Sequence, residues 1–256
     1  MADKFKLTRA KRVSVPVNPH VQYSIKQCPL TTNQCARMKG VPYCKVIGSI
    51  LWPTVVSRHD TAYAVGILSQ FMQNPGQAHW EAVKRVISYL GSTKNLWLTF
   101  GGGGKAELEG YCDSDWASQP HCHLISGFSF HYGQGLVSWS SKKQGIITLS
   151  SMEAEYVAEM HASKEAIWLG MFTRELTGQK INPLTIKADN QGAIALAKDN
   201  KFHAWTKHIG LWYHFVCEVV KARKIKKWST YQHPEMWLIS SQRHWWNRNL
   251  KSLLGS

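Results

Sequence analysis

Four consecutive glycines at positions 101–104 divide this chain of 256 residues into two parts whose hydrophobic patterns differ. Before the glycines, apolar residues recur at helical spacing, as Trp80, Val83 and Ile87 do. After them, short runs alternate between apolar and polar residues, which is typical of strands. A run of glycines is also a linker signal. The sequence therefore predicts a mostly helical first part and a second part that contains a sheet.

In the first part, two residues mark the expected helix boundaries. Pro53 is expected to end a helix that begins near residue 43, because proline lacks a backbone N–H and clashes with the preceding turn. Asp60 is expected to cap the next helix with its carboxylate. Residues 96–100 are expected to form a short strand just before the linker.

The second part begins with three alternating runs that predict an antiparallel meander, followed by a long helix that opens at Ser150 or Ser151. The strands are expected at 108–112, 126–132, 136–140, 184–188 and 225–231, and the helices at 150–178, 190–198 and 203–223. This order predicts an α+β fold with a mixed five-stranded sheet and flanking helices.

The charge balance favours a polyanionic partner. Lys and Arg total 31 against 16 Asp and Glu, so the formal net charge is +15. A basic surface that is merely solvated is the alternative, and charge alone leaves it open.

Other features concern the cellular compartment. No apolar run approaches the roughly 20 residues that cross a bilayer, and the N-terminus has no apolar signal-peptide core. The six cysteines are scattered without a CxxC pair, which favours reduced thiols over a disulfide framework or a zinc site. We therefore expect an intracellular protein, in the cytoplasm or nucleus, that is neither secreted nor inserted in a membrane.

Three acidic residues stand where such a sheet brings chain ends together. Asp113 follows the first expected strand, Glu155 lies in the first turns of the long helix, and Asp189 ends the fourth strand. Carboxylates that converge in this way can hold a hard divalent cation such as Mg²⁺. Two such ions roughly 4 Å apart activate a water and stabilise the leaving oxygen of a phosphodiester. Spacing alone leaves open the alternative that all three are ordinary solvated acids.

Five segments of the second part resemble the ribonuclease H domain of copia-type retrotransposon polyproteins. They are Gly-Tyr-Cys-Asp-Ser-Asp-Trp-Ala at 110–117, Val-Ser-Trp-Ser-Ser-Lys-Lys-Gln at 137–144, Leu-Ser-Ser-Met-Glu-Ala-Glu-Tyr at 149–156, Ala-Asp-Asn-Gln-Gly-Ala-Ile-Ala-Leu-Ala at 188–197 and His-Ala-Trp-Thr-Lys-His at 203–208. Upstream, residues 42–49, 62–65 and 79–86 look like the end of the reverse transcriptase of the same polyproteins. The resemblance covers the chain from about residue 3 to about residue 231.

The resemblance implies an RNase H-like fold that cuts the RNA strand of an RNA–DNA hybrid with two Mg²⁺ ions, or with Mn²⁺ in their place. The catalytic acids of the family match Asp113, Glu155 and Asp189, whose role is metal coordination while water is the nucleophile. It also implies a domain division: residues 1–104 as the end of the reverse transcriptase with its linker, and residues 105–235 as the RNase H domain. In an intact element the partner is the rest of the Pol polyprotein.

Recognition of a hybrid is expected to rest on phosphates and 2′-hydroxyls rather than on base edges. Lys142, Lys143 and Lys207 are candidates for these nucleic-acid contacts. For each lysine, the alternative is a solvated surface charge.

The end of the chain departs from the family pattern. Ser240 stands where the family carries a fourth acid, and residues 236–256 have no likeness to it. One legitimate encoding of residues 236–245 gives the family word Asn-Val-Ala-Asp-Ile-Phe-Thr-Lys-Ala-Leu in a neighbouring reading frame. We therefore expect a degenerate tail after a frameshift between about residue 225 and residue 235. The chain is then either a hybrid-specific ribonuclease that lacks one acid or an inactive, basic nucleic-acid-binding relic.

Several single positions also depart from the family pattern. Trp205, Trp212 and Cys217 stand where the family commonly has Arg, and His59 where it usually has Pro. A C-to-T change converts an Arg codon to Trp or Cys, so these positions agree with decay. Variation between lineages is the alternative.

Overall fold

The computed structural model describes residues 12–18, 20–100, 107–115, 124–133, 135–145, 150–178, 184–188, 210–222 and 225–230. The chain forms two compact units: the first holds the described residues up to 98, and the second holds the described residues from 99 onward. None of the helices in these ranges combines the length and the hydropathy needed to cross a bilayer.

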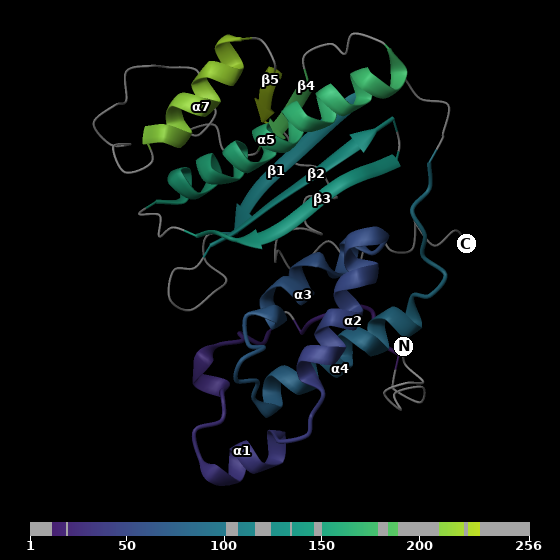
Figure 1. Cartoon of the computed structure of the whole chain (residues 1–256), viewed down its shortest axis with the longest axis vertical. Helices are drawn as coiled ribbons and strands as arrows, with labels where there is room; N and C mark the ends of the chain where they lie inside the picture. The colour runs from purple at the N-terminus through teal and green to yellow at the C-terminus, as the bar shows by residue number, and fades with distance from the viewer. Residues whose placement is uncertain are drawn as a thin grey trace. The chain divides into compact units, whose positions relative to one another are not determined.

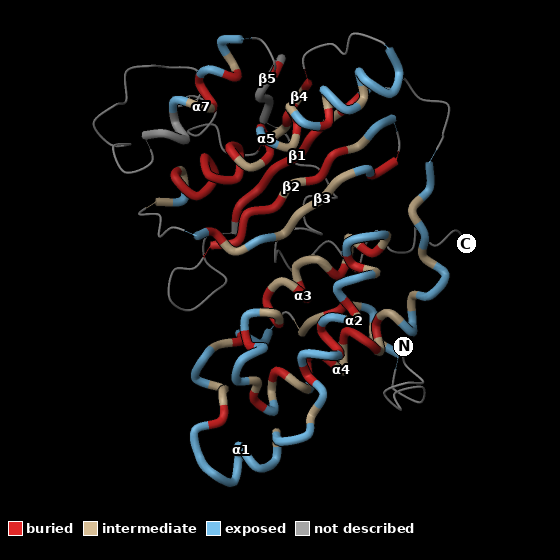
Figure 2. Tube along the Cα trace, viewed as in Figure 1, coloured by how far each residue is buried: buried red, intermediate tan, exposed pale blue. Residues whose placement is uncertain are grey.

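The first unit is a group of short helices (Figure 1). Its central helix is α2 (Tyr43–Val56), which packs against both α3 (Ala62–Ser69) and α4 (Gln77–Ser92). Each of these helices buries one apolar face, which appears as red stretches along the tube in Figure 2. The smaller elements are η2 (Ile25–Gln27), α1 (Thr32–Met38) and η3 (His59–Thr61).

The prediction that Pro53 ends a helix is wrong, because α2 continues through it to Val56. Pro53 lies in the last turn, where the missing N–H costs the helix only one hydrogen bond. The N–H groups of Ser57 and Arg58 both still donate to the Pro53 carbonyl and complete the turn.

Two further predictions for the first part of the chain are wrong. The N-cap of α3 is Thr61, whose side chain makes no capping bond, and Asp60 binds Arg58 instead of a helix N-terminus. Residues 96–100 form no strand. Trp97 and Phe100 are 78% and 61% exposed, so the alternation there has no buried face to stabilise a strand.

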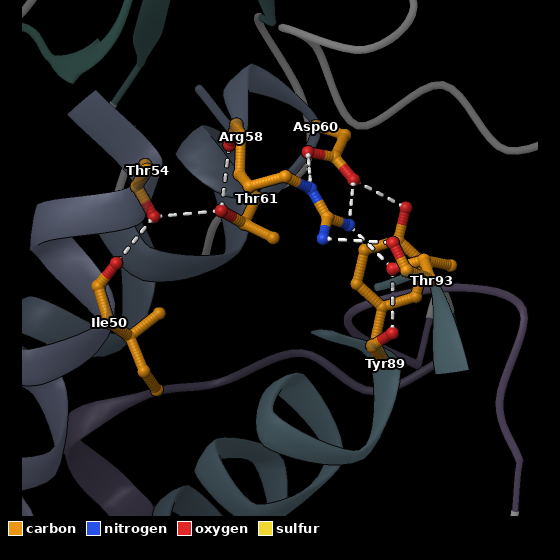
Figure 3. A network of polar contacts seen from close by, with 7 residues as sticks. All are labelled: Ile50, Thr54, Arg58, Asp60, Thr61, Tyr89 and Thr93. Carbon is orange, nitrogen blue, oxygen red and sulfur yellow. Dashed lines mark hydrogen bonds and ion pairs between the residues drawn. The ribbon is translucent and has the colours of Figure 1, made fainter. Parts of the chain in front are cut away.

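The guanidinium of Arg58 is the centre of a polar network that joins η3 to the end of α4 (Figure 3). Its Nε and Nη2 donate to the two carboxylate oxygens of Asp60, at 3.0 and 2.7 Å. The same guanidinium donates to the carbonyl and the hydroxyl of Thr93, at 3.2 and 2.5 Å. The Tyr89 hydroxyl completes the set by donating to Asp60 Oδ2 at 2.5 Å.

This ion pair is withdrawn from water, since the Arg58 and Asp60 side chains are only 10% and 9% exposed. Burial alone would lower the pKa of Arg58, but the hydrogen bond and charge of Asp60 raise that pKa above its ordinary value. The two side chains therefore depend on each other as partners in a buried pair.

Replacing Arg58 by Met should lower the free energy of unfolding of the first unit by about 3–5 kcal/mol, because a buried carboxylate is left without its cation. Lys84→Met is the control. Lys84 pairs with Glu81 at 2.7 Å, but those side chains are 31% and 55% exposed, so its loss costs at most about 1 kcal/mol. The measurement is denaturant-dependent hydrogen exchange of the α3 and α4 amides in the full chain. Equal costs for the two substitutions would contradict this account.

The second unit is built on a mixed sheet of five strands in the order β3-β2-β1-β4-β5 (Figure 1). The strands are β1 (Leu108–Asp115), β2 (Ile125–Tyr132), β3 (Gly135–Lys143), β4 (Leu184–Ala188) and β5 (Ile225–Thr230). The β1–β2 and β2–β3 pairs are antiparallel, and the β1–β4 and β4–β5 pairs are parallel. The predicted α+β fold with a mixed five-stranded sheet is confirmed.

The long helix α5 (Ser151–Thr177) has the boundaries that the sequence predicts. The Ser150 hydroxyl caps it by accepting from the Glu153 N–H at 3.2 Å. Gly178 ends it with a φ of +66°, in the left-handed region that glycine adopts without strain. α5 packs on β1, β2 and β4, and α7 (Gly210–Lys221) packs on α5 and β5.

One apolar core lies between the sheet and these two helices. Phe130 of β2, Tyr156 of α5, Ile186 of β4 and Val216 of α7 are all completely buried in it. Cys217, one of the departures from the family pattern, is 5% exposed in the same core. The helix expected at 203–223 is observed over the range of α7; residues 203–209 and the helix expected at 190–198 lie outside the described residues.

Candidate active site

Two of the three predicted catalytic acids lie within the described residues. Asp113 is on β1 and is 8% exposed, and Glu155 is in the second turn of α5 and is 7% exposed. Since β1 and β4 are parallel, their C-terminal ends lie at the same edge of the sheet. Asp189, the residue after the last one of β4, lies outside the described residues.

A hydrogen bond joins Glu155 of α5 to Ser114, the residue that follows Asp113 on β1. The backbone N–H of Ser114 donates to Glu155 Oε2 at 3.1 Å, across 41 positions of sequence. The Glu155 carboxylate is thereby held against the C-terminal part of β1, one residue from Asp113. The structure thus places the Glu155 carboxylate beside the residue that follows Asp113 on β1.

The strand geometry separates the side chains of β1 into two sets. Leu108 and Cys112 belong to the apolar core under α5, and the alternation of a strand places Glu109, Tyr111 and Asp113 on the other face. Glu155 approaches the end of the strand from the α5 side. The Asp113 and Glu155 carboxylates therefore flank the end of β1.

The Glu109 carboxylate on that second face is already committed to a cation. Lys187 Nζ, on the neighbouring β4, donates to Glu109 Oε2 at 2.9 Å and to the Tyr111 hydroxyl at 3.1 Å. The hydrogen bond from Lys187 lowers the pKa of Glu109 below its ordinary value. Glu109 is therefore a structural acid.

Two more acids of α5 are buried near the site, and the sequence did not single them out. Glu153 is 8% exposed, and Glu159, one turn after Glu155, is not exposed at all. The Ser163 hydroxyl donates to the Glu159 backbone carbonyl at 2.7 Å on the same face. The signal was present in the four-residue spacing of Glu155, Glu159 and Ser163 on a helix face otherwise rich in alanine.

The chemistry of the donors suits a hard cation, because both acids offer carboxylate oxygens, the ligands that Mg²⁺ prefers. Within the described ranges no group of three or more His, Cys, Asp or Glu side chains is arranged to hold a metal ion. Two of the three predicted ligands, Asp113 and Glu155, lie within those ranges, and their role in metal binding stays a prediction.

Two of the three predicted nucleic-acid-binding lysines are on β3. Lys142 is exposed and Lys143 is partly exposed, and consecutive residues of a strand point to opposite faces. Burial, with smaller effects from the charges of Lys164 and Lys142, lowers the pKa of His161 on α5. Lys142 therefore lies close enough to His161 for its charge to act on that imidazole. Lys207 lies outside the described residues.

The sheet order, its mixed strand directions and the long helix α5 packed across β1, β2 and β4 define an RNase H-like fold. A solved structure, RNase H1 from Halobacterium salinarum, covers 48% of this chain and 82% of its own, with 17% identity and a TM-score of 0.33. No family model matches the sequence.

Curated relatives match at higher identity. A retrovirus-related Pol polyprotein from a transposon of Nicotiana tabacum is 40% identical over 235 residues, or 91% of this chain and 18% of its own. A second one, from Arabidopsis thaliana, is 33% identical over 85% of this chain and 14% of its own. A Plasmopara viticola protein named a secreted RxLR effector is 47% identical over 142 residues, which are 55% of this chain and its own entire length.

The chain belongs to the retrovirus-related Pol polyproteins of copia-type transposons, and its second unit has the strand order of an RNase H-like fold. It spans less than a fifth of the length of the two Pol polyproteins that it matches.

Gly110, in the segment that leads to Asp113, is needed for close packing at the site. A Cβ at this position would lie 2.3 Å from Cε1 of Phe130, whose ring is completely buried. Gly110→Ala should therefore lower the free energy of unfolding of the second unit by about 1–3 kcal/mol through overpacking. Gly145→Ala is the control, because a Cβ there meets nothing within 4 Å. Denaturant unfolding of both variants tests this, and a neutral Gly110→Ala would refute it.

Proposed function

We propose that the second unit is a ribonuclease H that hydrolyses the RNA strand of RNA–DNA hybrids with two Mg²⁺ ions, or with Mn²⁺ in their place. The observation that carries this proposal is the bond from the Ser114 N–H to Glu155 Oε2, which holds a helix carboxylate at the residue that follows Asp113. Asp189, by sequence the residue that follows β4, is proposed as the third ligand.

In this proposal the protein holds and orients charge. Asp113 and Glu155 would bind divalent cations through carboxylate oxygens, and the low exposure of both limits competition from bulk water. When bound, such cations neutralise the charge that develops on the phosphate and promote attack by water. Lys142, Lys143 and Lys207 would contact the phosphate backbone, since a hybrid is recognised by its phosphates and 2′-hydroxyls.

The domain assignment forms part of the proposal. Residues 1–104 are the end of a reverse transcriptase with its linker, residues 105–235 are the RNase H domain, and residues 236–256 are a degenerate, frameshifted tail. The rest of a Pol polyprotein is the partner in an intact element. The protein would act in the cytoplasm or the nucleus, where RNA–DNA hybrids form.

A second candidate function is nucleic-acid binding without cleavage. The acids in the range 12–100 are Asp60 and Glu81, and each is already paired, with Arg58 and Lys84 respectively. The other Lys and Arg residues of that range thus find no carboxylate within it, and the whole chain carries +15. Such a surplus favours a polyanion by itself. Ser240, in place of the fourth acid, would weaken the metal site and leave binding as the surviving activity.

Cleavage of a labelled RNA–DNA hybrid by the full chain with Mg²⁺ tests the nuclease proposal. Asp113→Asn keeps the size of the side chain but removes the charge that holds the cation. Cleavage should fall at least about a hundredfold, which corresponds to about 3 kcal/mol of lost transition-state stabilisation. Glu109→Gln is the matched control, because Glu109 is on the same face of β1 but is bonded to Lys187. It should retain most of the parent activity.

The outcomes separate the two functions. Equal loss in both variants would contradict the role of Asp113. A parent chain that binds the hybrid in a salt-dependent manner but leaves it intact would support the second function instead of the first.

A further inference from the structure

Gln144 ends the Val-Ser-Trp-Ser-Ser-Lys-Lys-Gln segment directly after β3, and its side chain is buried at 3% exposure. Its amide nitrogen Nε2 makes two hydrogen bonds. One goes to the Ser126 hydroxyl of β2 at 2.6 Å, and the other to the Ala154 carbonyl of α5 at 3.0 Å. Both hydrogens of the amide group are thereby used.

The orientation of this amide is fixed by chemistry. The Ala154 carbonyl can only accept a hydrogen bond, so the NH₂ group and not Oε1 has to face it. Gln144 Oε1 is buried and has no hydrogen-bond partner among the described residues. The attachment of Gln144 to its surroundings through this side chain therefore rests on its two N–H donors.

These bonds close a ring of contacts around the candidate site. Ser126 pairs directly with Ser114 across β2 and β1, and the Ser114 N–H donates to Glu155 Oε2. Glu155 follows Ala154, which accepts from Gln144. From Gln144 the ring returns to Ser126.

We propose that Gln144 is a positioning residue: its side-chain amide ties the Ala154 carbonyl of α5 to Ser126 of β2 and thereby holds the Glu155 carboxylate at the end of β1. The proposal deepens the nuclease function and, for its bearing on metal binding, rests on it. Gln144 does not touch the reacting atoms and acts only through Glu155. An amide suits this place because it offers two donors on one nitrogen, whereas Glu or Met at the same length offers none.

Two readouts test the proposal in the full chain. The first is hydrogen exchange of the Ser114 amide in the metal-free protein, since that N–H is the one bonded to Glu155. The second is the affinity for Mn²⁺ alone, measured calorimetrically. Gln144→Met, which keeps the length and removes both donors, should speed Ser114 exchange by about tenfold and weaken Mn²⁺ binding by about tenfold or more.

A pair of serine variants keeps the test decisive if Gln144→Met fails to fold. Ser126→Ala removes one acceptor of the Gln144 amide and should shift both readouts in the same direction. Ser129→Ala is the matched control. Ser129 is also buried on β2, but its hydroxyl has no hydrogen-bond partner among the described residues, so both readouts should stay at the parent value.

The positioning role and the nuclease function can fail separately. Parent-like Ser114 exchange and Mn²⁺ affinity in Gln144→Met, or equal effects of the two serine variants, overturn the positioning role. If the parent itself binds no Mn²⁺, the nuclease function fails, while Ser114 exchange still decides whether Gln144 holds Glu155.

Discussion

The second unit depends on the close approach of α5 to the sheet. Ala154, Ala158, Ala162 and Ala166 recur every fourth residue and are each at most 1% exposed, so the helix presents a face with almost no side-chain bulk. Only a helix that lies this near can bring the Glu155 carboxylate within hydrogen-bonding distance of a backbone N–H on β1. The same approach lets Gln144 reach the Ala154 carbonyl from the end of β3. Small side chains on one helix face are thus the condition for both contacts at the site.

Local signals in the sequence were enough for the second unit. Alternating runs predict the strands, Ser150 caps α5 and Gly178 ends it, because these features depend on neighbouring residues alone. In the first unit, the helix boundaries predicted from local signals at Pro53 and Asp60 are wrong. Asp60 has the chemistry of an N-cap, but Arg58 and, from α4, Tyr89 offer it buried partners, and this tertiary alternative prevails. No local pattern shows that competition.

The candidate site also contains residues that the sequence alone identifies and residues that it does not. Asp113 and Glu155 stand out from the sequence because strand ends and helix starts are where acids converge, and because their segments resemble a known family. Glu159 and Gln144 do not stand out. Their importance comes from burial and from contacts between elements, such as the 18 positions that separate Gln144 from Ser126. The position of His59 shows the opposite case: the structure makes it the first residue of η3, where a proline is readily accommodated. The proline that the resemblance implies at this position would therefore fit the backbone of η3.

The length of α5 has a consequence for the effect of substitutions in the core. The helix has 27 residues, or about 40 Å, with Glu155 near one end and core residues such as Met160 and Leu169 farther along. Because a helix tilts as one body, a small repacking of the core at the far end of α5 displaces the Glu155 carboxylate at the near end. Substitutions in the core at the far end of α5 would therefore change where the Glu155 carboxylate lies relative to β1.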